Sequence, residues 1–172
     1  MDHFSVTSVH PATIKHALKG HPWITKDHLS SQWPKNTLLL HVKLAPQKIY
    51  TYLHDPQHTF CVARLIHTEK ITTLEEWQKL IEQRMENAIK KRQELTALKN
   101  RNHYWLIFAE ADLLPGLYIV YLNGHILIQT HMAYWNERIK DVISTLEYVF
   151  QRLAFTYSSF WWQTRKIGRA HV

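Results

Sequence analysis

Residues 72–99 read TTLEEWQKLIEQRMENAIKKRQELTALK, and this stretch predicts one long helix with a single apolar face. Thr73 and Glu76 form a capping box, in which the hydroxyl accepts a first-turn amide and the carboxylate reaches back to the cap residue. Beyond the cap, apolar residues recur at three- and four-residue intervals, namely Leu74, Trp77, Leu80, Ile81, Met85, Ala88 and Ile89. The other face is charged, so the helix must pack through one stripe onto strands on either side of it in the chain.

Strand patterns precede this helix. Residues 37–44 and 49–54 alternate with a period of two, and Thr59–His67 reads as a third strand leading into the helix. Nearer the N-terminus, Thr13–Leu18 predicts a short helix ended by Gly20. Trp23 and Trp33 bracket an irregular stretch, which we interpret as a cover over one edge of the core, with a surface aromatic site for peptide or sugar as the alternative.

The second half repeats the order of strands followed by a helix. His103–Ala109 predicts a strand with Tyr104, Leu106 and Phe108 on one side. Asn123 and Gly124 then predict a two-residue type I′ hairpin turn, which needs positive φ at both positions. The turn fixes the register and assigns one face to the core, comprising Leu117, Ile119, Tyr121, Ile126, Ile128 and Met132. The other face comprises Tyr118, Val120, Leu122, His125, Leu127, Gln129 and His131.

Asn136 is a candidate cap for a last helix with an unbroken apolar stripe, formed by Ile139, Val142, Ile143, Leu146, Val149, Phe150, Leu153 and Tyr157. Two one-sided helices and hairpin-connected strands predict an α+β fold. We expect a two-layer sandwich, with an antiparallel sheet of about six strands, both main helices on one face and a short N-terminal helix.

The chain length fits one domain, which we place at residues 1–166. Residues 167–172 read IGRAHV, the translation of the start of a widely used sequencing adapter. We therefore expect this tail to be an artefact of an assembled environmental fragment and the natural chain to be truncated at its C-terminus. The aromatic run from Phe155 to Trp162 resembles either a membrane-facing interfacial segment or a helix end that packs on the lost part, and we prefer the second interpretation.

Composition and the lack of an apolar signal or membrane segment predict a soluble, cytoplasmic protein. Hydrophobic residues make up 45% of the chain, which is too many for a disordered protein, and no stretch approaches the 18 apolar residues of a membrane span. The single cysteine, Cys61, excludes an internal disulfide and is expected to be buried and unreactive.

The motifs of familiar chemistry are missing from the sequence. His54 and His58 flank a turn but have no third ligand at a recognisable spacing, so no metal is expected. Cys61 has no helix N-terminus after it to lower its pKa, and no serine stands in a nucleophile elbow. With 4 Gly in the chain, neither a P-loop nor a dinucleotide fingerprint can be written, so no cofactor is expected.

Two surfaces are candidates for binding another protein. The first is the hairpin face with Tyr118, His125, Gln129 and His131. If this face is open to solvent, its contiguous aromatic and polar patch is expected to bind another molecule. The second is the cover formed around Trp23 and Trp33. The order of strands, long charged helix, hairpin and final helix is similar, in layout only, to small α+β binding domains that include some bacterial immunity proteins.

Nucleic acid is the alternative partner. The formal charge is +7, and a polyanion that is neutralised by Lys and Arg releases counterions. The only dense cluster of cations lies at the C-terminal end of the long helix, where cations also complement the helix dipole: Lys90, Lys91, Arg92, Lys99 and Arg101.

From these patterns the sequence predicts a non-enzymatic protein-binding module, either immunity-like or an accessory factor of secretion or conjugation. A nucleic-acid-binding domain and an enzyme of unrecognised type are the alternatives. No residue is nominated for catalysis.

Overall fold

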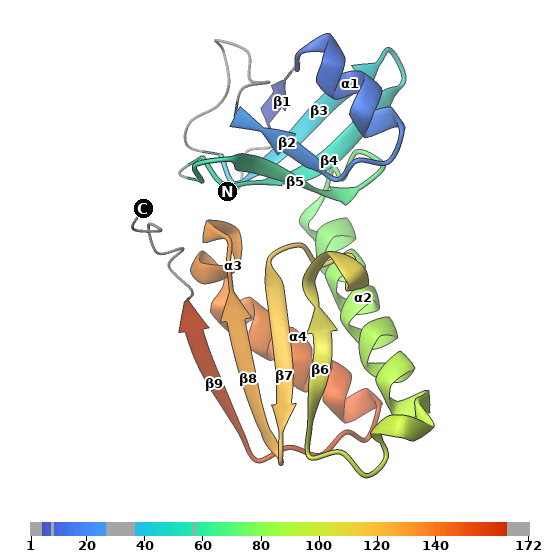
Figure 1. Ribbon diagram of the computed structural model, residues 1–172, viewed down its shortest axis with the longest axis vertical. Helices are drawn as coiled ribbons and strands as arrows, with labels where there is room; N and C mark the ends of the chain where they lie inside the picture. Colours follow the sequence, from blue (N-terminus) through green and yellow to red (C-terminus); the bar gives the residue numbers. More distant parts are fainter. Residues whose placement is uncertain (1–4, 8, 27–36, 57, 165–172) are drawn as a thin grey trace. The chain divides into compact units, whose positions relative to one another are not determined.

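The computed structural model describes residues 5–7, 9–26, 37–56 and 58–164, and the chain divides into two compact units. Unit 1 is Met1–Thr73 and unit 2 is Leu74–Val172, so the boundary lies directly before the long helix. Each unit contains its own sheet (Figure 1). The α+β class is confirmed, but the expected single sheet of about six strands is wrong. The suspected tail, residues 167–172, lies outside the described residues.

Unit 1 is built on a five-stranded sheet with the order β1-β3-β4-β5-β2. Its strands are β1 (Ser5–Thr7), β2 (Trp23–Thr25), β3 (Leu39–Ala45), β4 (Lys48–His54) and β5 (Cys61–His67). β1 is parallel to β3, and the other neighbours are antiparallel. Helix α1 (Pro11–Leu18) links β1 to β2. The sequence patterns predicted α1, β3, β4 and β5, but the two outer strands have only 3 residues each, too few to show a period.

Aliphatic side chains and one tyrosine form the core of unit 1. Leu40 and Val42 on β3, Tyr52 on β4 and Val62 on β5 are all essentially inaccessible to solvent. Ala17 brings α1 onto the same cluster. Burial of this apolar surface, at about 25 cal/mol per Å², is the main term that stabilises the unit.

Two histidines are also buried in this sheet. His41 on β3 is 1% exposed and His54 on β4 is fully buried. Burial lowers the pKa of both imidazoles because it disfavours their charged form. His54 donates from Nδ1 to the carbonyl of Thr37, which fixes the neutral tautomer.

Unit 2 is a two-layer arrangement with a four-stranded sheet of order β6-β7-β8-β9. Its strands are β6 (His103–Phe108), β7 (Leu117–Leu122), β8 (His125–Thr130) and β9 (Ser159–Thr164). Its helices are α2 (Leu74–Glu94), α3 (Ala133–Glu137) and α4 (Ile139–Arg152), with 3₁₀ turns η2 (Thr96–Leu98) and η3 (Ala109–Asp112). α2 and α4 pack against each other on one side of the sheet (Figure 1), as expected for the two main helices.

The hairpin of β7 and β8 has the predicted register. Leu122 pairs with His125, and Asn123 and Gly124 have φ of 47° and 90°, as a type I′ turn requires. Ile119 and Ile128 pair with each other and are fully buried beneath the helices. The turn therefore determines which side chains face the core.

α2 begins at Leu74, directly after the predicted cap residue, and buries most of its predicted apolar stripe, although Leu74 is 58% exposed and Leu80 is only partly buried. Trp77, Ile81, Met85 and Ile89 are its larger buried residues. Its other residues are strongly charged, and in the described part of the chain no helix is both long and apolar enough to cross a membrane.

The end of unit 2 differs from the expectation. Asn136 does not cap the last helix but lies inside α3, where its side chain accepts a hydrogen bond from the Thr130 hydroxyl. α4 ends at Arg152, and the aromatic run that follows forms β9 rather than a helix end. β9 pairs in parallel with β8, with Trp161 beside Leu127 and Trp162 beside Ile128. The aromatic run fits either structure by composition, and the strand is selected because it completes the sheet.

A register irregularity in β6 changes the sidedness expected for that strand. Trp105 pairs with Val120 and Ile107 with Ile119, so the register shifts at Leu106. Leu106 and Ile107 are both buried, while Phe108 is 44% exposed. The expected set of Tyr104, Leu106 and Phe108 on one side is therefore wrong, because a bulge sends the residues after it to the opposite face.

Candidate functional site

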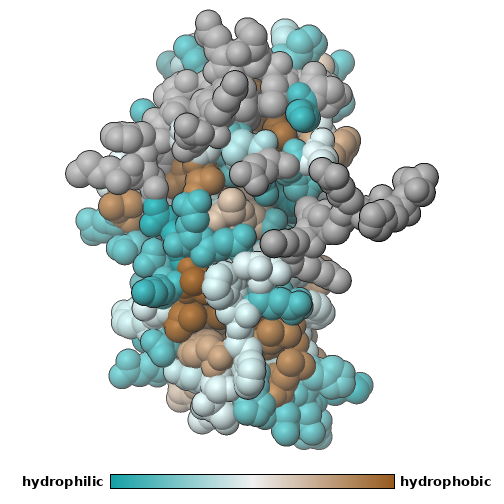
Figure 2. All heavy atoms as spheres, turned by 90° about the vertical axis from the view of Figure 1, so that its left-hand side faces the viewer, coloured by the Kyte–Doolittle hydropathy of each residue, from teal (hydrophilic) through white to brown (hydrophobic). Residues whose placement is uncertain are grey.

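The sheet of unit 2 leaves one face free of helices, and we call it the open face. It consists of the side chains that alternate with the buried ones: His103, Trp105, Phe108, Tyr118, Val120, Leu122, His125, Leu127, Gln129, His131, Ser159, Trp161 and Gln163. All four predicted hairpin residues lie on it. Figure 2, viewed from the side of the β9 edge, shows hydrophobic side chains at the surface among hydrophilic ones.

Aromatic rings gather at one end of the open face. The ring centroids of Trp105 and Phe108 are 5.3 Å apart, and Tyr118 lies 5.7 Å from the first and 5.4 Å from the second. The ring of His131 is 4.7 Å from Tyr118. The rings pack edge-to-face or tilted against one another, but Trp105 remains 40% exposed and Phe108 44% exposed. Together they expose a large apolar surface to solvent.

Polar pairs link β8 to β9, one at the hairpin turn and one beside the aromatic rings. His125 Nδ1 is 2.8 Å from the Ser159 hydroxyl, and the Trp161 indole donates to the same hydroxyl at 3.0 Å. Gln129 donates to Gln163 at 3.5 Å. The structure thus brings Tyr118, Gln129 and His131 together, whereas His125 belongs to a separate group at the turn.

The strands that form the open face carry no formal charge. None of the six residues of β6, β7, β8 or β9 is Asp, Glu, Lys or Arg. With 20% charged residues in the chain, about one would be expected in each strand. The face is therefore aromatic, aliphatic and neutral-polar.

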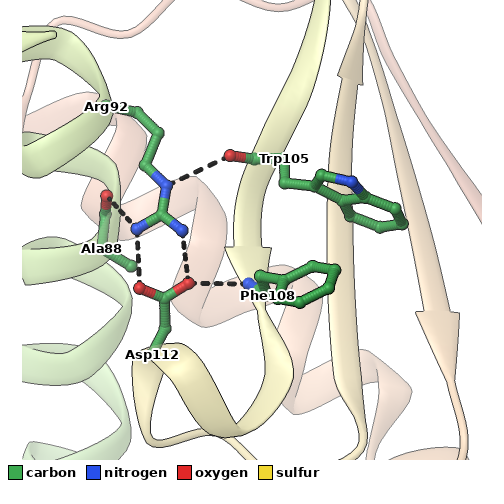
Figure 3. A network of polar contacts seen from close by, with 5 residues as sticks. All are labelled: Ala88, Arg92, Trp105, Phe108 and Asp112. Atoms are coloured by element: carbon green, nitrogen blue, oxygen red, sulfur yellow. Dashed lines mark hydrogen bonds and ion pairs between the residues drawn. The ribbon is translucent and has the colours of Figure 1, made fainter.

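The most buried ion pair in the described part of unit 2 joins Arg92 to Asp112. Arg92 donates through two nitrogens to both carboxylate oxygens of Asp112, each at 2.6 Å (Figure 3). Asp112 also accepts from the Phe108 amide at 2.7 Å, and Arg92 donates to the carbonyls of Trp105 and Ala88. The network ties α2 to β6 and η3, and its carboxylate side chain is only 4% exposed.

Two members of the basic cluster at the end of α2 are engaged in ion pairs within the protein. The Arg92 guanidinium is engaged with Asp112, and Lys90 pairs with Glu86 at 2.6 Å. Lys91, Lys99 and Arg101 are exposed, so they remain the members that present charge to solvent. Their binding to nucleic acid stays a prediction.

Unit 1 carries a second basic group, which also contains aromatic rings and which we call the α1–β2 surface. It consists of Lys15, His16, Lys19, His21, Trp23 and Arg64. His21 stacks edge-on between the rings of His16 and Trp23, at 6.2 Å from each. Trp23 pairs with Arg64 across β2 and β5, and the guanidinium lies 5.7 Å above the indole.

Trp23 was predicted as a binding residue, and the structure places it on this surface, 40% exposed. Trp33, its predicted companion, lies outside the described residues. The structure does not test whether Trp23 or Trp33 binds a partner, so their binding role stays a prediction.

A hollow of about 530 Å³ lies in unit 1 beside the start of β4. Lys48, Tyr50, Glu69 and Lys70 are among the residues that line it. The segment after β5 is held in place by Thr51, whose hydroxyl donates to the Glu69 carbonyl and accepts from the Ile71 amide. All of its charged lining residues are solvent-exposed, so the hollow has the character of a surface depression rather than an enclosed pocket.

Among the described residues there is no metal-type cluster of three or more His, Cys, Asp or Glu. His58 Nδ1 accepts from the amides of Phe60 and Cys61, and His54 is bonded to Thr37, so each histidine of the considered pair has a structural role. Cys61 is buried, and its thiol donates to the Ala63 carbonyl at 3.6 Å.

Sequence reasoning missed several of these residues. Trp105 and Phe108 share the open face only because of the bulge in β6. Trp161 lies on that face only because β9 is a strand paired with β8. Arg64 lies beside Trp23 only because β5 pairs with β2, and nothing in the sequence indicated that pairing. The available signal was the absence of charge from all the strand segments after residue 102, which is visible in the sequence.

No protein-family model matches the chain, and no curated protein matches it by sequence. Its fold is similar to the crystal structure of SMU.776, described as "a putative methyltransferase complexed with SAH", with a TM-score of 0.78 and 13% identity over 95% of this chain and 40% of that one. A second similar structure is described as "a putative sam-dependent methyltransferase from Streptococcus mutans", with a TM-score of 0.75, 13% identity and coverage of 95% and 41%. The chain thus spans about two fifths of the length of the solved structures that it matches.

These likenesses correct the functional prediction. The sequence favoured a non-enzymatic protein-binding module, immunity-like or an accessory factor, and that prediction is wrong because the two similar structures named above are each described as "a putative" methyltransferase. The enzyme alternative is the better supported one. The likeness in layout to immunity proteins does not extend to the fold of the whole chain, since two sheets replace the expected one.

Proposed function

We propose that this chain is the substrate-binding portion of a SAM-dependent methyltransferase that acts on a nucleic acid. The observation that carries the proposal is the fold likeness over 95% of the chain to a structure described as "a putative methyltransferase complexed with SAH". A likeness at 13% identity supports the fold, and the assignment of activity and substrate is our inference from it.

The described residues do not fit the cofactor itself. Nucleotide cofactors bind outside the carboxyl ends of a parallel, doubly wound sheet, beside a glycine-rich turn that leads into a helix. In the described residues the only parallel pairs are β1 with β3 and β8 with β9, each at the edge of a sheet. Gly20, Gly116 and Gly124 each lie alone in a turn. We therefore assign SAM to a portion that matches the remaining three fifths of the similar structures and assign substrate contacts to this chain.

Charge supports a nucleic acid as the substrate. The formal charge is +7, and the described cations of unit 1 outnumber its described acids, which are Asp55 and Glu69. The α1–β2 surface combines lysines with Trp23 and histidine rings, and that combination can neutralise phosphates and stack on unpaired bases. At the end of α2, by contrast, Arg92 and Lys90 are engaged in ion pairs.

The test measures binding of a fluorescent single-stranded oligonucleotide to the chain by anisotropy, over a range of salt concentrations. Reversing two cations with Lys15→Glu and Lys19→Glu should weaken binding and reduce the slope of log K against log salt by about 1.4, because each phosphate contact to a single strand contributes roughly 0.7. Trp23→Ala should cost about 1–3 kcal/mol of binding with little change in the salt slope, because stacking releases no counterions.

The matched control reverses two exposed lysines of unit 2, Lys79→Glu with Lys140→Glu, so that the change in net charge is the same. Equal losses from both double variants would mean a non-specific charge effect and would contradict the assignment of the α1–β2 surface. A larger loss from Lys91→Glu with Arg101→Glu would move the substrate contact to the end of α2. Absence of oligonucleotide binding in the complete enzyme, at low salt, would remove nucleic acid as the substrate.

A further inference from the structure

The open face of unit 2 has no role in the substrate contacts proposed above. We propose that it is the docking surface for the SAM-binding portion of the enzyme. The inference rests on the proposed function, because it takes its occupant from there, but it depends on different residues and can fail separately.

The first reason is the amount of apolar surface that the open face exposes. Trp105, Phe108 and Leu122 are each more than a third exposed, and Trp161 is 64% exposed. These side chains lie on three adjacent or near-adjacent strands of one sheet, so they form one patch rather than scattered residues. Contiguous patches of this kind on soluble proteins mark surfaces that another molecule covers.

The second reason is charge, which selects a protein over nucleic acid. A polyanion surface must supply Lys or Arg, and the four strands supply none. The core of a protein interface is depleted in charge and enriched in aromatic residues. Trp105 and Trp161 have the size and exposure of interface anchors.

The third reason is the β9 edge. Within the described residues β9 has a neighbour on only one side, so its other side presents backbone amides and carbonyls. Edge strands are usually protected from unwanted pairing by lysine, proline or a bulge. β9 reads SFWWQT and has none of these, although the chain is rich in lysine elsewhere. Coverage of this edge by another part of the same enzyme provides the protection instead.

The occupant follows from size and from net charge. The similar structures extend well beyond the matched 40% of their length, so a methyltransferase with this fold contains a large portion outside it. The cofactor fold is missing from the described residues and belongs to that portion. A second copy of this chain is the less suitable occupant, because two chains of formal charge +7 repel each other and the face has no acids to offset that repulsion.

The test uses thiol labelling, which the chain makes simple because Cys61 is its one cysteine and is buried. Gln163→Cys places a reactive thiol on the open face, and Gln83→Cys places one on an exposed position of α2 as the matched control. Labelling rates are compared between the chain alone and the complete enzyme, in which the SAM-binding portion is joined to it or produced with it. We expect the Gln163→Cys variant to label about tenfold more slowly in the complete enzyme, and the Gln83→Cys variant to change less than about twofold, since reactivity requires access to the thiol.

A second set of variants tests the anchors directly. Trp105→Ser and Trp161→Ser should each restore fast labelling of the Gln163→Cys variant in the complete enzyme. Leu95→Ser removes an exposed apolar side chain elsewhere in unit 2 and should leave the protection unchanged. Folding of each variant is checked by circular dichroism of the chain alone.

Three outcomes would overturn the proposal. Equal labelling of the Gln163→Cys variant in both forms would mean that the face is not covered. Protection of the chain alone that increases with its concentration would assign the face to a second copy, and protection of the chain alone by an oligonucleotide would assign it to the substrate. SAM binding is measured in the same samples by calorimetry: a complete enzyme that protects the face but binds no SAM contradicts the proposed function, whereas one that binds SAM with an unprotected face contradicts only the docking surface.

Discussion

Unit 1 and unit 2 place their buried polar groups differently. Unit 1 buries two neutral histidines, His41 and His54, in the middle of its sheet. Unit 2 keeps its strands free of charge and buries one ion pair, Arg92 with Asp112, beside them. The comparison teaches that the two units should respond to different perturbations: unit 1 to pH near neutrality and unit 2 to loss of a charged partner.

The largest effect is expected from breaking the ion pair of unit 2. Asp112→Ala leaves the Arg92 guanidinium, 16% exposed, without its carboxylate and removes the acceptor of the Phe108 amide. Removal of one partner from a buried pair costs about 3–5 kcal/mol of unfolding free energy. Urea denaturation followed by tryptophan fluorescence measures the loss. The control is Arg152→Ala, which removes a guanidinium that is 45% exposed from Glu82 and Glu86; it should cost about 0–1 kcal/mol, because Glu86 keeps its pair with Lys90. Similar costs for both variants would contradict the structural role of the network.

The two faces of the unit 2 sheet sharpen the comparison. Ile119 and Val120 are neighbours on β7, but the first is fully buried and the second lies on the open face. Ile119→Ala should cost roughly 2–4 kcal/mol of unfolding free energy, because it opens a cavity beneath the helices. Val120→Ala should cost well under about 1 kcal/mol in the chain alone, as surface substitutions usually do. Urea denaturation of both variants checks the difference, and comparable losses would mean that the open face is buried in the chain alone.

The histidines of unit 1 predict how it responds to acid. Burial lowers the pKa of His54 and His41 in the folded chain, so the unfolded chain binds more protons once the pH falls below the usual histidine pKa of 6.5. Stability is therefore full above that pH and decreases as the pH falls from 6.5 toward the folded pKa values. Hydrogen exchange of the β3 and β4 amides between pH 7.5 and pH 5.5 measures this, after correction for the intrinsic rate.

The control for this prediction is His54→Asn, which removes the titrating ring but retains a side-chain donor for the Thr37 carbonyl. The variant should lose less stability than the wild type over the same pH range. Amides of β7 and β8 in unit 2 serve as the internal reference, because no histidine is buried in the described part of that unit. Equal acid sensitivity in both units would contradict the comparison.

Helices and strands could be predicted from the sequence where they are long enough, or one-sided enough, to carry a pattern of their own. α2 and the β7–β8 hairpin were predicted because a 21-residue stripe and an Asn-Gly turn are local signals. The division into two sheets was missed because β1, β2 and β9 are defined by their partners in the sheet and not by a pattern of their own. On the open face, Tyr118, Gln129 and His131 followed from the register, whereas Trp105 and Phe108 required the bulge at Leu106. A bulge is a tertiary feature of strand pairing, so a period-two pattern cannot reveal it.

The smallest effect is expected at the exposed ion pairs of α2. Lys90 and Arg152 lower the pKa of Glu86, chiefly through the Lys90 hydrogen bond, so this carboxylate stabilises the fold at neutral pH and the contribution is lost as the pH falls below its usual value of 4.5 through the folded pKa. Because Lys90 is about half exposed, Glu86→Gln should cost less than about 1 kcal/mol at pH 7, and less still at 1 M salt. Urea denaturation at pH 7 and pH 3 measures the difference between variant and wild type, which should disappear at the lower pH. A cost that matches that of Asp112→Ala would show that exposure does not separate the two kinds of ion pair in unit 2.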